Sequence, residues 1–221
     1  MLSSYYRYIK PILNIIRREK RKTVEFISNK TTDVQDTARR TASHRSRRRV
    51  NLPFDTDEGL TLLVDLKADP TSSIDLLHQA LEPLRPHLTY AKKDGQIRKG
   101  KVTVLISGNR PSEESLVNAE GERYMFIDGR ARDVERNTDS ALVPMVSIPW
   151  RSMQLARMFG RGERYMKNMV EQAHDQGKLL RIWGAPNNER NWRKMLKSNV
   201  DYLSIDDHAK FATFASRVHR I

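Results

Sequence analysis

From residue 60 onward, the apolar residues of this chain follow two alternating spacings. Short runs of consecutive apolar residues, bounded by polar or glycine-containing stretches, are typical of strands that are covered on both faces. Stretches with apolar residues three and four positions apart are typical of helices that cover a core with one face. The pattern therefore predicts a sheet with helices packed outside it.

Six apolar runs predict strands, and helical patterns separate most of them. The strands are expected at 60–66, 101–107, 123–129, 142–148, 178–184 and 200–206. The helices are expected at 72–84, 111–118, 151–176, 188–198 and 208–218, with an interruption near Gly160 and Gly162. This alternation predicts an α/β fold with a parallel sheet. Six units fit either an open doubly wound sheet or most of a (β/α)₈ barrel.

The first fifty residues lack this alternation and carry most of the charge. The chain has 221 residues and a formal charge of +13. Residues 1–50 contain 14 Lys and Arg against 4 Asp and Glu, whereas residues 51–221 contain 26 against 23. We therefore predict a basic, largely disordered leader at 1–50 and one folded domain at 51–221. The positive charge of the leader predicts weak contact with polyanions or a membrane surface. No specific nucleic-acid partner is expected.

Composition and motifs exclude several kinds of chemistry. Cysteine is absent, which excludes disulfides, thiolate metal sites and a thiol nucleophile. Because chains without disulfides suit a reducing compartment, an intracellular location is expected. The run from Gly95 to Lys101 fits part of a phosphate-binding loop. It lacks the following Ser or Thr and leads into a strand instead of a helix, so we interpret it as a turn.

Polar side chains gather where the predicted strands end, which is where ligands bind in parallel α/β folds. For Ser107, Ser147 and Asn187, capping of the following helix is the favoured interpretation. The full set at these strand ends is Asp65, Lys67, Ser107, Asn109, Asp128, Arg130, Ser147, Trp183, Asn187, Asp206 and Asp207.

The stretch LLVDLKAD places Asp65 and Lys67 two positions apart, so both side chains lie on the same face of one strand. A structural salt bridge and a functional pair explain this spacing equally well. In the functional interpretation, the carboxylate holds a divalent cation and the ammonium group neutralises a phosphate oxygen.

Six stretches, taken in their order and spacing over roughly residues 52–216, resemble one family. They are LTLLVDLKAD, GKVTVLISGNRP, FIDGR, LVPMVS, GKLLRIWGAPNN and VDYLSIDD. They are similar to the C-terminal part of the altered inheritance of mitochondria protein 6 family, which are fungal phospholipase-C-like phosphodiesterases. The wider superfamily to which this family belongs has a (β/α)₈ barrel, usually with a divalent metal. The resemblance therefore implies an incomplete TIM-type barrel of about six βα units.

The resemblance also implies roles for three residues. Asp65 would bind a divalent metal, Mg²⁺ or Ca²⁺, and Lys67 would be catalytic and bind the substrate phosphate. Trp183 would line the substrate pocket. The implied activity is that of a phosphoric diester hydrolase of lipid metabolism acting on a phosphodiester or phospholipid-type substrate. The family name points to a mitochondrial link.

One departure from the family changes what we expect of this chain. The family's first two strands carry histidines that act as general acid and base, and nothing in residues 1–50 resembles them. We therefore expect a chain without the first two βα units and with impaired turnover. The alternative is a non-catalytic barrel remnant that binds phosphoryl ligands or a protein. Unpaired strand edges would pair with another chain, rearrange or destabilise the fold.

Overall fold

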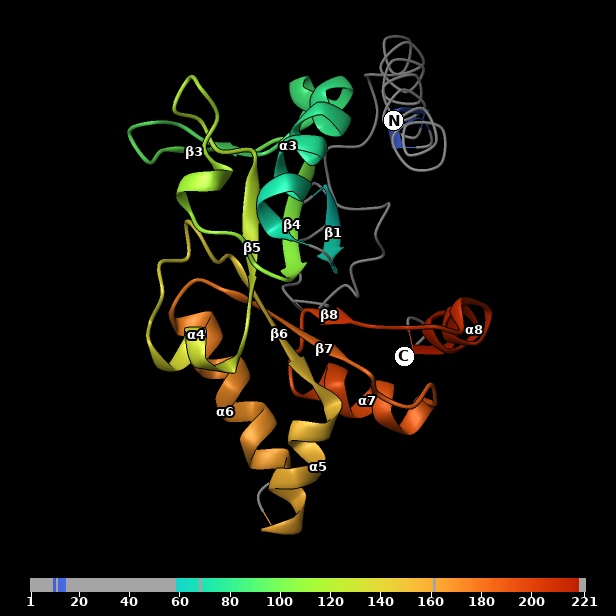
Figure 1. Ribbon diagram of the computed structural model, residues 1–221. Coiled ribbons are helices and arrows are strands. Elements are labelled where there is room, and N and C mark those ends of the chain that lie inside the picture. Colours follow the sequence, from blue (N-terminus) through green and yellow to red (C-terminus); the bar gives the residue numbers. More distant parts are fainter. Residues whose placement is uncertain (1–9, 11, 15–58, 68, 161, 219–221) are drawn as a thin grey trace, which may run out of the picture.

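The computed structural model describes residues 10, 12–14, 59–67, 69–160 and 162–218. Its centre is a six-stranded parallel sheet in the order β1-β4-β5-β6-β7-β8 (Figure 1). The strand ends differ from the predicted boundaries by at most three residues, which confirms the parallel α/β arrangement. They are β1 (Leu60–Leu66), β4 (Val102–Gly108), β5 (Met125–Gly129), β6 (Met145–Pro149), β7 (Leu179–Trp183) and β8 (Tyr202–Leu203).

Helices connect successive strands of this sheet. The predicted interruption near Gly160 and Gly162 is confirmed, because two helices lie between β6 and β7. The predicted helix at 111–118 is wrong in extent, since only one turn forms there. The elements are α3 (Pro70–Leu81), η2 (Glu82–His87), η3 (Glu114–Leu116), α4 (Ala131–Glu135), α5 (Trp150–Met158), α6 (Gly162–Asp175), α7 (Glu189–Lys197) and α8 (His208–Val218).

Two apolar layers lie on the two faces of the sheet because side chains alternate along each strand. The larger layer packs beneath the helices and includes Val104, Ile106, Ile148 and Ile182. The smaller layer lies on the inner, concave face. It is formed by Ala91, Leu105, Phe126 and Met145, with Leu63, Ile97 and Tyr202 packed against them.

The sheet is curled, so that its first and last strands approach each other across the inner face. Strands β1 and β8 are not hydrogen-bonded neighbours. Even so, the hydroxyl groups of Thr61 on β1 and Tyr202 on β8 lie 3.1 Å apart. The fold is therefore a curled half-barrel, and an open, flat doubly wound sheet does not describe it.

Two small elements were not predicted. A short antiparallel hairpin, β2 (Tyr90–Ala91) with β3 (Ile97–Arg98), precedes β4. Helix α4 has only five residues. Neither element is long enough to show a period of its own in the sequence.

The prediction of a disordered leader falls mostly outside the described residues. Within the leader, Lys10 and residues 12–14 are helical. Leu13 is buried with the larger apolar layer, and Ile12 packs against that layer. At least one turn of the leader therefore contributes to the core.

Candidate functional site

The sequence-predicted pair lies at the carboxyl end of β1, on the inner face. Lys67 Nζ is 2.6 Å from Asp65 Oδ2, and the two side chains are 82% and 49% exposed. Exposed ion pairs contribute about 0–1 kcal/mol to stability, because water screens them and ordering long side chains costs entropy. The pair is therefore a weak stabiliser of the fold, and both groups are open to solvent and ligands.

The loop after β4 fixes the backbone beneath this pair. Asp65 lies opposite Ser107 in the strand register. Gly108 has a φ of +76°, and a Cβ there would collide with the Asp65 carboxylate and the Leu66 carbonyl, so glycine is needed for both reasons. The backbone N–H of Asn109 donates to the Leu66 carbonyl at 2.8 Å, and its side-chain amide donates to the Lys67 carbonyl at 3.2 Å.

Beside this pair on the inner face, five side chains form a polar layer, here called the inner polar layer. Its members are Ser107, Asp128, Ser147, Arg181 and Ser204. The Ser107 hydroxyl donates to Asp128 Oδ2 at 2.7 Å. Arg181 donates to the hydroxyl oxygens of Ser147 at 3.3 Å and Ser204 at 3.4 Å. The layer thus runs from β4 to the end of β8, and a polar band lies between the apolar inner cluster and the strand ends.

Asp128 is the most unusual member of the inner polar layer, because it is a buried carboxyl group. Burial raises its pKa, although hydrogen bonds from Ser147 and Ser107 and the charge of Arg181 oppose the rise. Its Oδ1 is buried and has no hydrogen-bond partner among the described residues. A buried acceptor of this kind is commonly satisfied by water or a bound group.

Arg181 connects this layer electrostatically to the strand ends. Burial lowers its pKa, while the charges of Asp128 and Asp65 raise it. Because Asp65 lies on β1 and Arg181 on β7, this interaction acts across the curl of the sheet. The site therefore combines two carboxyl groups with two cationic groups, Lys67 and Arg181.

The buried carboxyl group predicts a pH-dependent contribution to stability. The folded chain favours the protonated form of Asp128, so its stabilising contribution is complete below its ordinary pKa of about 3.8 and is lost as the pH rises through the raised value. The free energy of unfolding of wild type relative to Asp128→Asn should therefore fall as the pH rises from about 4 towards neutrality. Urea unfolding of both proteins across this pH range measures the difference, and a pH-independent difference would contradict the assignment.

Trp183 lies at the end of β7, on the same face as Arg181 by strand alternation, and its ring is partly exposed. Among the described interactions, none joins its ring to Asp65 or Lys67. The structure thus brings the acid and the lysine together and places the tryptophan separately, at the carboxyl end of β7.

The capping interpretation is wrong for three rim residues. Ser107 and Ser147 point to the inner face and bond to members of the inner polar layer. Asn187 exchanges hydrogen bonds with Asp206 at 2.9 and 3.1 Å, whereas Asn188 caps α7. The alternation of side chains along β4 and β6 sends the serine hydroxyls inward, away from the helix that follows.

Arg181 is the residue that sequence reasoning missed. The signal was present in KLLRIWG, where an arginine interrupts an apolar strand two positions before Trp183. A charged residue inside a strand is rarely buried without a partner. The strand register identifies that partner as Ser147, which lies opposite Arg181 on β6.

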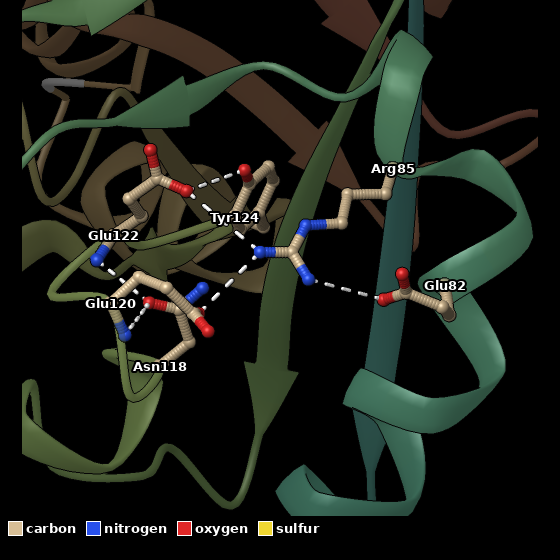
Figure 2. A network of polar contacts seen from close by, with 6 residues as sticks. All are labelled: Glu82, Arg85, Asn118, Glu120, Glu122 and Tyr124. Atoms are coloured by element: carbon tan, nitrogen blue, oxygen red, sulfur yellow. Dashed lines mark hydrogen bonds and ion pairs between the residues drawn. The ribbon is translucent and has the colours of Figure 1, made fainter.

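A second polar cluster lies at the opposite end of the sheet, around Arg85 (Figure 2). Its guanidinium group lies 3.4, 3.5 and 3.9 Å from the carboxylates of Glu82, Glu120 and Glu122. It also lies 5.0 Å from the ring centre of Tyr124. Three carboxylates surround one cation, so this cluster suits phosphate poorly. Its contacts join η2 to the loop before β5.

The residues that the structure describes do not supply a complete metal site. No group of three or more His, Asp or Glu side chains in this part of the chain could hold a metal ion. Asp65 is the exposed carboxylate at the carboxyl end of β1, and Asp128 is a buried carboxyl group on β5. Divalent cations such as Mg²⁺ and Ca²⁺ take six or more oxygen ligands, so Asp65 alone fits only as one ligand of a larger set.

The described helices give no candidate for a membrane span, since none joins sufficient length to sufficient apolar character.

Curated relatives share part of their length with this chain. It is 28% identical over 175 residues to altered inheritance of mitochondria protein 6 of Eremothecium gossypii, covering 68% of this chain and 45% of the relative. The protein of the same name from Candida glabrata is 29% identical over 157 residues, covering 58% and 38%. That of Kluyveromyces lactis is 24% identical over 203 residues, covering 72% and 48%. The chain thus spans about half the length of these relatives or less.

No solved structure matches the chain significantly. The family described as AIM6-like phosphodiesterase domain matches residues 5–128. The match begins inside the basic leader, which sequence reasoning had left outside the resemblance, and it ends at Asp128. It includes Asp65, Lys67 and Ser107. The chain therefore belongs to the family of AIM6-like phosphodiesterase domains.

Proposed function

We propose that this chain is part of a phosphoric diester hydrolase that acts on a glycerophospho- or phospholipid-type substrate. The observation that carries the proposal is the solvent-open Asp65–Lys67 pair at the carboxyl end of β1, next to the inner polar layer. Membership of a phosphodiesterase family supports it. We also propose that the six strands of the sheet are the strands of six units of a (β/α)₈ barrel.

In this proposal Lys67 binds the substrate phosphate. Its ammonium group is exposed at the strand end and can donate hydrogen bonds to a phosphate oxygen while it remains near Asp65. Charge that develops on the phosphate oxygens during hydrolysis is stabilised by such a fixed cation. Trp183, at the carboxyl end of β7, would contact the organic part of the substrate.

Asp65 is proposed as one ligand of a divalent cation, Mg²⁺ or Ca²⁺. Such a cation, when bound, would polarise the phosphoryl group. The described residues provide too few carboxylates to complete its coordination. The remaining ligands would have to come from parts of the family fold outside the described residues.

Turnover by this chain alone is proposed to be weak. General acid–base catalysis contributes about 10²- to 10⁴-fold. Residues 1–50 contain no stretch like the family's histidine-bearing strands, although the family match begins at residue 5. Of the described histidines, His174 pairs with Asp201 at 2.8 Å at the amino end of β7, and His78 lies beside the Arg85 cluster. Both lie at the amino ends of the strands, away from Lys67, whereas His208 begins α8 on the carboxyl side of β8.

The incomplete cation site favours a second candidate function, a non-catalytic module that binds phosphoryl ligands through Lys67. The two candidates separate in one assay, in which release of nitrophenol from bis(p-nitrophenyl) phosphate is followed with Mg²⁺, with Ca²⁺ and with a chelator. Chelator-sensitive release supports the hydrolase. Diester binding without release, unaffected by the chelator, supports the binding module.

Further proposals concern partners and location. The basic leader would make weak contact with polyanions or membrane surfaces. The outer edges of β1 and β8 have no strand neighbour among the described residues, and a second chain could pair there. The relatives are named for mitochondrial inheritance, and we propose an intracellular location with a mitochondrial link for this chain as well.

A further inference from the structure

The last two turns of α5 and the residue that follows them carry three large apolar side chains that are exposed. Leu155, Met158 and Phe159 have 64%, 80% and 76% of their surface accessible. In Figure 1, α5 and α6 extend beyond the sheet on the side toward which β6 points. Apolar side chains gathered at a projecting tip are a costly arrangement in water and typically mark a contact surface.

The opposite side of the same hairpin is well packed, so the tip is presented by a fixed support. Met153 on α5 and Met166 on α6 are buried in the core. Gly162 lets the helices approach closely, since a Cβ there would lie 2.9 Å from the Arg157 Cβ and 3.1 Å from the Met153 carbonyl oxygen. One face of the hairpin therefore packs in the core, and Leu155, Met158 and Phe159 lie outside the core.

The two helices that carry the apolar tip also carry exposed cationic side chains. Arg151, Arg157, Arg164 and Lys167 are all exposed, and none forms an ion pair within the described part of the chain. An apolar tip on helices that carry exposed cations matches the interface of an anionic bilayer, where apolar groups enter the acyl boundary and cations meet the headgroups.

We propose that the α5–α6 tip docks on an anionic phospholipid surface. Helix α5 follows β6 directly, so the tip lies at the carboxyl ends of the strands, as do Asp65 and Lys67. Docking would thus turn the candidate site toward the lipid headgroups. The proposal concerns binding alone and stands whether or not the chain hydrolyses diesters.

Flotation of the full chain with vesicles tests the proposal. Wild type should bind vesicles that contain phosphatidylserine more tightly than vesicles of phosphatidylcholine alone, and less tightly at high salt. The triple variant L155S/M158S/F159S should lose at least about tenfold in affinity, because burying one large apolar side chain is worth about that factor. The matched control L76S changes a 57% exposed leucine on α3 and should bind as wild type.

A tryptophan reporter gives a second reading that does not depend on comparing affinities. The chain has three tryptophans, so the signal is the change relative to wild type. On the same vesicles F159W should show a larger shift to shorter wavelength and stronger quenching by brominated acyl chains than wild type, whereas L76W should show neither increase. Equal affinity of wild type and the triple variant would overturn the proposal, as would absence of vesicle binding by wild type. Self-association that the triple variant abolishes, without vesicle binding, would assign the tip to a protein contact and overturn it too.

Discussion

Replacing Lys67 by alanine should lower the rate of phosphodiester hydrolysis by about 10²- to 10³-fold, the loss typical of removing one fixed donor to a developing oxyanion. Because the side chain is exposed, the substitution should change the rate with little effect on folding. Its ion pair with Asp65, at 2.6 Å, is largely open to solvent, so its loss should change stability by no more than about 1 kcal/mol. Release of nitrophenol from bis(p-nitrophenyl) phosphate measures the rate.

The matched control for this variant is Lys99→Ala, which removes another exposed lysine from the loop before β4, at the amino ends of the strands. Its rate should equal that of wild type, because only the carboxyl ends face the proposed site. Equal rates for wild type and Lys67→Ala would remove Lys67 from the mechanism. An equal loss in both variants would show that general surface charge, and not this position, governs the rate.

Replacing Trp192 by alanine should lower the free energy of unfolding by about 3–5 kcal/mol, the range for deleting a buried aromatic side chain. Trp192 is 1% exposed and packs against Phe211 and Phe214, with ring centres 5.1 and 5.3 Å away. It joins α7 to α8, which flank β8. Its loss leaves a cavity that these helices can fill only by moving.

Urea unfolding measures this loss as a shift of the midpoint at unchanged slope. Leu76→Ala provides the control, because Leu76 is a largely exposed position on α3 and its truncation should change stability by about 0.5 kcal/mol or less. A loss below about 1 kcal/mol in Trp192→Ala would mean that the α7–α8 contact does not stabilise the fold in solution.

The elements that sequence reasoning predicted well are those with a long, regular apolar pattern. The run LTLLVDL forms β1 over the predicted residues, because strands covered on both faces need such continuous runs. Pro144 lies inside the strand predicted at 142–148 but just before β6, and a proline outside the strand removes no hydrogen bond from the sheet. The strand is therefore real but begins at Met145.

Features that depend on distant contacts could not be predicted in this way. The curl of the sheet is visible in the Thr61–Tyr202 contact, which joins residues 141 positions apart. The inner polar layer is of the same kind. Asp128 and Ser107 were recognised as polar strand ends, but their bond requires the register of β4 and β5, which composition and periodicity do not give.

The candidate site was predicted only in part, because some of its members come together through contacts between distant strands. Asp65 and Lys67 are two positions apart on one strand, so local geometry alone places them together, and the structure has them so. Arg181 lies on a strand four places away in the sheet order, and only the fold brings its charge within reach of Asp65.

Binding of a phosphodiester tests the central claim most directly, because it does not require the chain to turn over its ligand. Calorimetric titration of glycerophosphocholine into wild type, Lys67→Ala and Lys99→Ala measures it. The Asp65–Lys67 site predicts that Lys67→Ala binds at least about tenfold more weakly, the worth of one charge-assisted hydrogen bond, while Lys99→Ala binds as wild type. Undiminished binding by Lys67→Ala would contradict the account.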